Sequence, residues 1–152
     1  MPSVSLPDED HLSRYCKPTA VGSDGLPTTG AFLLRPTEDH LSVNWLEYFA
    51  LNDLGAAVER VRVAFHRKGY QVRPNGRFAI LGVGPARAAV EGIIGRHGRV
   101  VRLPLEDDQS HAGIFGYTAD DFGVAVALRA LVRREHVHPA VSERIGRGLN
   151  GS

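Results

Sequence analysis

A nearly continuous apolar run, Arg77–Val83 (RFAILGV), constrains the fold more than any other stretch of this 152-residue chain. A strand with apolar residues at successive positions has to be covered on both faces, whereas a half-exposed strand alternates apolar and polar residues. Gly84 and Pro85 follow directly, and a proline in the first turn is typical of a helix start. The run therefore predicts a buried strand that leads into a helix.

Three segments have the apolar spacing of amphipathic helices. One runs from an N-cap at Asn52 to about Lys68, a second begins at Gly84, and a third runs from Thr118 to about Glu135. In each, apolar residues recur three or four positions apart, which places them on one helix face. Each helix is therefore expected to pack on a sheet.

Five segments are predicted to be strands, among them the buried run described above. The first two are expected to form a hairpin, and the unit at 77–105 a right-handed parallel crossover. This element order predicts an α+β (or α/β) fold: a single-domain mixed sheet of about five strands with three main helices packed on it. The five expected strands are Ala31–Arg35, His40–Asn44, Arg77–Val83, Val100–Leu105 and Ser110–Phe115.

Proline and glycine divide the chain into three parts. Residues 1–29 contain four prolines and two glycines, so we expect a loop-rich lead segment with at most one short helical turn near Asp8–Tyr15. Residues 30–138 are expected to form the globular α+β domain. Residues 139–152, with one proline and three glycines, are expected to be a flexible tail.

Composition excludes several classes of protein. Hydrophobic residues make up 43% and charged residues 23%, as in globular domains. No apolar run approaches the roughly 20 residues of a membrane span. The first residues lack the basic and apolar regions of a signal peptide. Cys16 is the only cysteine, so no internal disulfide forms. These features predict a cytoplasmic protein without membrane contact.

Charge is distributed unevenly along the chain. Residues 1–59 carry three Lys/Arg against nine Asp/Glu, a net charge of −6, whereas residues 60–152 carry fifteen against eight, a net charge of +7. The favoured interpretation is that the two parts neutralise each other across their contact; the other is an anion-binding face. Aromatic residues are few and scattered, so any nucleic-acid contact is expected to be unspecific.

Two histidines give the sharpest hypothesis about chemistry. His40 and His111 each lie near the start of a predicted short strand. Two histidines that face each other across a groove can act as general base and general acid on a phosphoester without a metal. Ser42 and Arg35 are then placed to bind the phosphate. The alternative is that both histidines are structural residues with local hydrogen bonds.

The tetrad His40-Leu-Ser-Val resembles the His-x-Ser/Thr-x element of the two-histidine phosphoesterases, in which the hydroxyl steadies a phosphate. The second tetrad, His111-Ala-Gly-Ile, departs from that element because Gly113 stands where the family has serine or threonine. The resemblance covers four residues at each site. It implies acid–base roles for the two histidines and phosphate binding by Ser42.

A second candidate is the glycine turn between the buried strand and the helix that follows. Gly82-x-Gly84 is placed like a phosphate-binding loop, with Arg87 nearby, although Arg87 also stands where the dinucleotide motif has its third glycine. No metal or cofactor is predicted. Neither Glu135-His136-x-His138 nor Asp107 and Asp108 with His111 matches a strong ligand spacing.

Trp45, the only tryptophan, is expected to be largely buried beside the helix that begins near Asn52; exposed, it would instead be a partner anchor. From these patterns the first expectation is a small, bacterial-type accessory or interaction domain that binds a protein partner or a second copy of itself. The alternatives are the phosphoester enzyme, acting on RNA or a nucleotide, and a nucleotide or anion sensor that uses the Gly84 turn.

Overall fold

The computed structural model describes residues 4–141. Within them, three helices pack on a six-stranded sheet, which confirms the predicted α+β class with one strand more than expected. None of the helices in this part of the chain combines the length and apolar character that a membrane span requires. The elements are β1 (His11–Cys16), β2 (His40–Trp45), α1 (Leu54–Arg67), β3 (Arg77–Gly82), α2 (Val83–Ile94), β4 (Arg99–Arg102), β5 (His111–Phe115), α3 (Phe122–Ala130) and β6 (Val137–Pro139).

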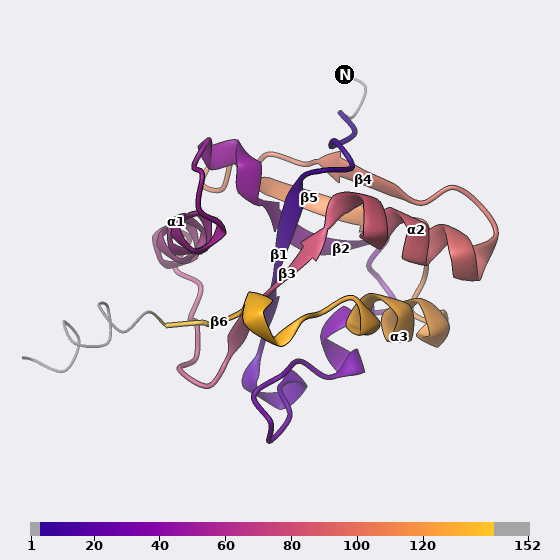
Figure 1. The fold of residues 1–152 in the computed structure, drawn as a ribbon, viewed down its shortest axis with the longest axis horizontal. Helices are drawn as coiled ribbons and strands as arrows, with labels where there is room; N and C mark the ends of the chain where they lie inside the picture. The colour runs from indigo at the N-terminus through magenta and orange to yellow at the C-terminus, as the bar shows by residue number, and fades with distance from the viewer. Residues whose placement is uncertain (1–3, 142–152) are drawn as a thin grey trace, which may run out of the picture.

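The sheet has the strand order β4-β5-β2-β1-β3-β6, and every neighbouring pair is antiparallel. Strand β1 therefore lies in the interior of the sheet, and Figure 1 shows it crossing the middle of the molecule. The helical turn expected near Asp8–Tyr15 is wrong. Six registered residue pairs with β3 stabilise an extended conformation there, a long-range contribution that local proline and glycine content does not reveal.

Two further expectations are corrected. The segment Ala31–Arg35 is not a strand: a 3₁₀ turn, Thr29–Phe32, replaces it and buries Phe32 completely. The expected hairpin is therefore absent, and β2 pairs instead with β1 and β5. Strands β3 and β4 are not neighbours either, because three strands lie between them. The unit at 77–105 thus spans most of the sheet rather than forming a local crossover.

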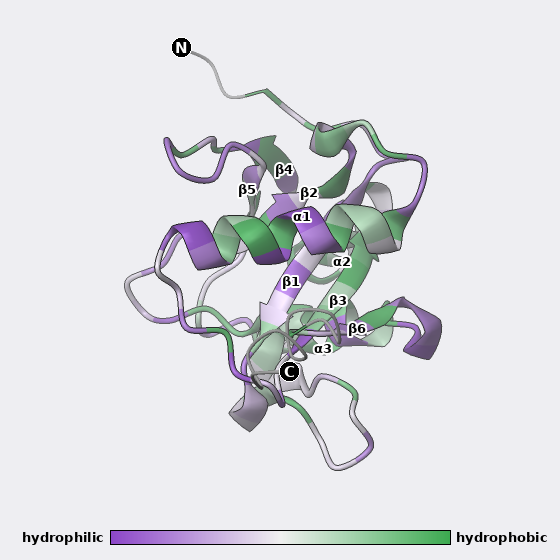
Figure 2. Cartoon of the chain, turned by 90° about the vertical axis from the view of Figure 1, so that its left-hand side faces the viewer, coloured by the Kyte–Doolittle hydropathy of each residue, from purple (hydrophilic) through white to green (hydrophobic). Residues whose placement is uncertain are grey.

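The helices cover both faces of the sheet (Figure 1). Helix α1 lies on one face and packs Val58, Val61 and Phe65 against β3; Figure 2 shows its alternating hydrophobic and hydrophilic surface. Helices α2 and α3 belong to the larger core on the other face. Both faces of β3 are consequently buried, from Phe78 through Leu81, which confirms the prediction from its apolar run.

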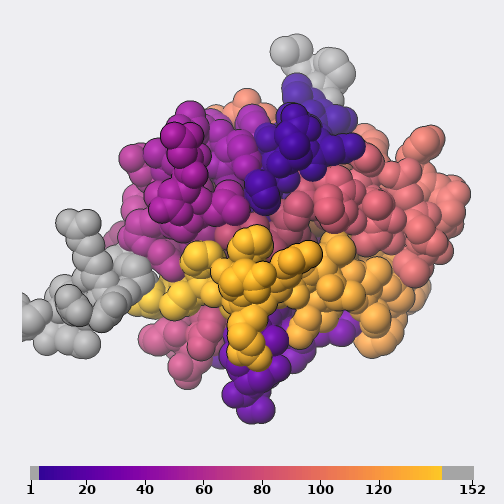
Figure 3. All heavy atoms as spheres, in the orientation of Figure 1, coloured from indigo at the N-terminus to yellow at the C-terminus, as the bar shows by residue number. Residues whose placement is uncertain are grey.

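Helix and strand limits differ from expectation by a few residues. Helix α1 is capped by Asp53 rather than Asn52, and the Asp53 carboxylate accepts a hydrogen bond from the Gly55 amide at 2.8 Å. Helix α3 already ends at Ala130, and the chain then crosses the middle of the face shown in Figure 3 to reach β6. Pro139 belongs to β6, while residues 142–152 of the predicted tail lie outside the described residues.

Strands β1 and β2 diverge soon after they meet. Only two residue pairs join them, Leu12–Trp45 and Ser13–Asn44, whereas β2 and β5 share five. We call the opening between β1 and β2 the fork. The Arg14 side chain lies in it: Nη1 donates to the Ser42 carbonyl at 3.0 Å, and Nε donates to the Ala31 carbonyl at 2.9 Å. The sheet thus consists of two three-stranded halves, β4-β5-β2 and β1-β3-β6, joined by a short seam.

Candidate functional site

The pairing of β2 with β5 brings His40 and His111 together on one face of the sheet. His40 lies opposite Phe115 and His111 opposite Asn44, so the two histidines lie on the same face with the Ser42–Gly113 pair between them. Their ring centroids are 6.2 Å apart, and the ring planes meet at 74°. Ser42 is two residues from His40 on the same strand and therefore shares its face. All three candidate catalytic residues lie in one small region.

Gly113, which replaces the expected hydroxyl residue of the second tetrad, makes this arrangement fit. A Cβ atom at position 113 would lie 2.9 Å from Cδ2 of His40 and 2.8 Å from Cδ1 of Leu103. Both distances are shorter than real Cβ contacts. The missing side chain thus leaves the space that the His40 ring occupies beside Phe115, at a centroid distance of 4.9 Å.

Each imidazole is oriented through its Nδ1 atom. Nδ1 of His40 lies 2.7 Å from a carboxylate oxygen of Asp39, and Nδ1 of His111 lies 2.9 Å from the Leu103 carbonyl. A carbonyl only accepts, so the His111 Nδ1 carries the proton and its Nε2 is the basic atom of the neutral ring. Burial lowers the pKa of His111 below its ordinary value. Within residues 4–141 neither Nε2 atom has a hydrogen-bond partner.

A pocket of about 470 Å³ opens at the fork, and His111 and Ser42 belong to its wall; we call it the fork pocket. Arg35, a predicted phosphate ligand, lines it too, so the structure brings this residue to Ser42 and His111. His40 does not line this pocket, but its ring centroid lies 6.2 Å from that of His111. The wall is strongly cationic, with Arg14, Lys17, Arg35 and Lys68 against one acid, Glu38.

A buried carboxylate beside the pocket was not recognised as part of this site from the sequence. Asp108 is 2% exposed and accepts hydrogen bonds from the Asn44 amide at 2.9 Å and from Ser110 Oγ at 3.1 Å. Lys68 Nζ forms an ion pair with it at 2.8 Å. These contacts hold Asn44 and Lys68 at the pocket wall. The sequence did place Asn44 on the same strand face as His40. Nothing in the sequence indicated that Asp108 would be the hydrogen-bond partner of Asn44.

The Gly84 turn and Arg87 lie elsewhere and are occupied by the chain itself. The Gly84 amide donates to the Asp8 carbonyl at 3.0 Å, and a Cβ atom at position 84 would lie 3.1 Å from that residue. Arg87 pairs with the carboxylates of Asp8 and Glu91. The structure therefore places these two predicted anion ligands against the loop that precedes β1, apart from the histidine pair.

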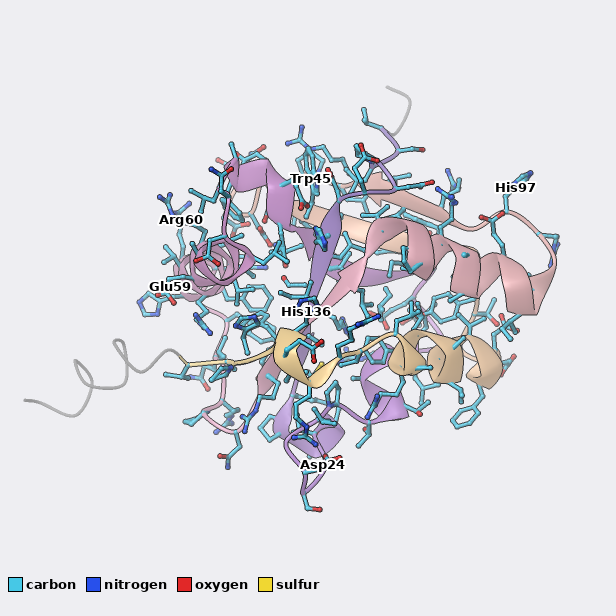
Figure 4. The ribbon with its side chains drawn as sticks, in the orientation of Figure 1. Asp24, Trp45, Glu59, Arg60, His97 and His136 are labelled. Carbon is cyan, nitrogen blue, oxygen red and sulfur yellow. The ribbon has the colours of Figure 1, made fainter. Side chains whose placement is uncertain are left out.

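Trp45 is half-buried, between the full burial and the exposed anchor considered from the sequence. Its indole Nε1 donates to the Asp10 carboxylate at 2.8 Å, and the Arg102 guanidinium lies 5.4 Å from its ring centroid. Figure 4 shows it in the upper middle of the molecule, well separated from His97 on the loop after α2. These contacts fix the indole within the chain.

Within the described part of the chain, no group of three or more His, Cys, Asp or Glu side chains is arranged to hold a metal ion. Comparison with known proteins finds no matching family model, no matching curated protein and no matching solved structure.

Proposed function

We propose that this chain is a metal-independent phosphoester enzyme whose acid–base pair is His111 and His40. The observation that carries the proposal is their adjacency, with ring centroids 6.2 Å apart beside a pocket with a cationic wall. Cationic side chains favour a phosphoester, which carries negative charge, and an imidazole transfers protons near neutral pH.

The two histidines take different roles because their surroundings differ. The basic Nε2 of His111 removes a proton from a water molecule as that water attacks phosphorus. A P–O bond forms, and the P–O bond to the leaving group breaks. His40, as the acid, gives its Nε2 proton to the leaving oxygen, while the Asp39 carboxylate 2.7 Å from Nδ1 orients the ring. Ser42 and Arg35, both at the pocket wall, bind the phosphate oxygens.

The first test measures hydrolysis of bis(p-nitrophenyl) phosphate and of a 2′,3′-cyclic nucleotide, with and without chelator. The rate is expected to be unchanged by chelator and bell-shaped in pH, because each histidine must hold the opposite protonation state. His111→Ala and His40→Ala should each lower kcat/KM by about 10²–10⁴-fold. His97→Ala is the matched control, because that side chain is 97% exposed.

The result that contradicts the proposal is equally specific. If neither substrate is turned over above the rate of the double variant His40→Ala/His111→Ala, the histidines are structural. Two candidates then remain: the accessory or interaction domain expected first from the sequence, with a protein partner or a second copy of the chain, and a nucleotide or anion sensor. Size-exclusion chromatography with light scattering separates those two partners.

The cellular setting is part of the same proposal. We infer a cytoplasmic protein from the single buried thiol, Cys16, which suits a reducing compartment. Fractionation of the producing cells tests this inference. Recovery of the native chain outside the cytoplasm would contradict it.

A further inference from the structure

Within residues 4–141, the fork pocket contains a cation that forms no direct ion pair, although one acid, Glu38, lines the same wall. Arg14 donates hydrogen bonds only to the uncharged carbonyls of Ala31 and Ser42, and no carboxylate within residues 4–141 pairs with it. Burial lowers the pKa of its guanidinium below the ordinary value. Arg14 is half-buried, and a guanidinium withdrawn from water in this way is costly unless an anion compensates it. The other cation deep in this region, Lys68, already has Asp108 as its partner.

Two further cations lie at the same pocket without an ion pair in the described residues. Lys17 follows the end of β1, and Arg35 precedes β2, so the two come from the chain on either side of the fork. Both side chains are exposed, which leaves them able to contact a bound ligand. Together with Arg14, they form a cationic set suited to a phosphate group.

The wall also contains an aromatic cluster. Tyr15, Phe65 and Tyr70 all line the pocket and contact one another edge to face, with ring centroids between 5.1 and 5.8 Å. Tyr70 is 51% exposed, so much of this ring is free of protein contacts. Aromatic side chains of this kind bind nucleobases by stacking, irrespective of sequence.

We infer that the fork pocket binds a nucleoside monophosphate unit, with its phosphate at Arg14, Lys17 and Arg35 and its base against the ring of Tyr70. The volume of about 470 Å³ is in the range of small-ligand and cofactor sites. The inference rests on the proposed function for one point only: the phosphate must reach His111, which belongs to the same wall. It adds the substrate class and names Arg14 and Tyr70 as binding residues.

Isothermal titration calorimetry tests the inference with three probes: uridine 3′-monophosphate, inorganic phosphate and uridine. The nucleotide is expected to bind at least about tenfold more tightly than either part alone, because it uses both sets of contacts. Tyr70→Leu should weaken nucleotide binding by about fivefold to a hundredfold and leave phosphate binding unchanged. Arg35→Ala should weaken both, whereas Arg96→Ala, at an exposed arginine outside the pocket, is the matched control.

Arg14 needs a separate design, because its hydrogen bonds also hold the fork. Arg14→Lys keeps the charge and loses the planar donor set, so binding of both nucleotide and phosphate should fall while thermal unfolding shows a folded protein. If that variant does not fold, Arg35→Ala and Lys17→Ala decide the question, since both side chains are exposed. The inference is overturned if nucleotide binds no better than phosphate, or if Arg96→Ala weakens binding as much as Arg35→Ala.

These experiments can contradict the binding inference and the proposed enzyme activity separately. His40→Ala should bind uridine 3′-monophosphate normally and lose hydrolysis, because His40 lies outside the pocket lining. Nucleotide binding without hydrolysis of any diester would overturn the proposed enzyme activity and leave the binding inference standing. Hydrolysis of bis(p-nitrophenyl) phosphate with no affinity for the nucleotide would overturn the binding inference and leave the proposed enzyme activity standing.

Discussion

Replacing Gly113 by alanine tests whether the His40 ring occupies the space above β5. The new methyl group would lie 2.8 Å from Cδ1 of Leu103 and 2.9 Å from Cδ2 of His40. Overpacking of this kind costs about 1–3 kcal/mol. Alanine in place of glycine also restricts the unfolded chain and returns about 0.4–1 kcal/mol. The net expectation from the midpoints of these ranges is a loss of about 1.3 kcal/mol in the free energy of unfolding.

Urea denaturation with constant m-value measures this loss, and Gly92→Ala is the matched control. Position 92 lies in α2, is exposed and has no atom within 4 Å of a built Cβ, so alanine there should stabilise the protein by about 0.5–1 kcal/mol. In a His40→Ala background the penalty at position 113 should shrink by at least about 0.5 kcal/mol, because one of its two close contacts is gone. Equal penalties in both backgrounds, or none in either, would refute the reasoning.

Two further predictions concern the core and the titration of the site. Ile80→Ala should lower the free energy of unfolding in urea by about 2–5 kcal/mol, because the Ile80 side chain on β3 is buried in the core beneath α1. A loss below about 1 kcal/mol would contradict that packing. Burial lowers the pKa of His111, so below about pH 6.5 the unfolded chain binds more protons than the folded one, and stability should fall as pH decreases through that range. The loss of stability with decreasing pH should be less steep for His111→Gln than for the unmodified protein. It should not vanish, since burial also lowers the pKa of His138. Identical slopes for the variant and the unmodified protein would contradict the prediction.

The parts of the fold that the sequence predicted are those with local periodicity. The stripe of α1 and the apolar run of β3 depend on residues a few positions apart, and both were placed within a few residues of their observed limits. Strand β1 was missed because its conformation depends on partners elsewhere. It pairs with β3, roughly 60 to 70 residues later in the chain, and with β2 over only two positions.

The residues of the candidate site also fall into two groups, those identified from the sequence and those that depend on contacts between distant segments. His40 and His111 were identified because histidine is conspicuous and both lie near the starts of strands. Arg14 and Tyr70 were not, because the role inferred for them depends on the divergence of β1 and β2, and no residue pattern indicates a pair of strands that separate after two contacts. The sequence indicated candidate groups for catalysis, and the tertiary structure showed where a ligand has room.

The interior position of β1 has a consequence for how the chain folds during synthesis. Residues 11–16 leave the ribosome before either neighbour, and their longest ladder forms only when residues 77–82 have been made. Synthesis at about 5–20 residues per second leaves β1 without that partner for several seconds. A sheet completed through such distant pairs is expected to fold slowly, since most of its contacts join residues far apart in the chain. For that interval Leu12 and Cys16, both buried in the finished sheet, are exposed to the folding machinery of the cell.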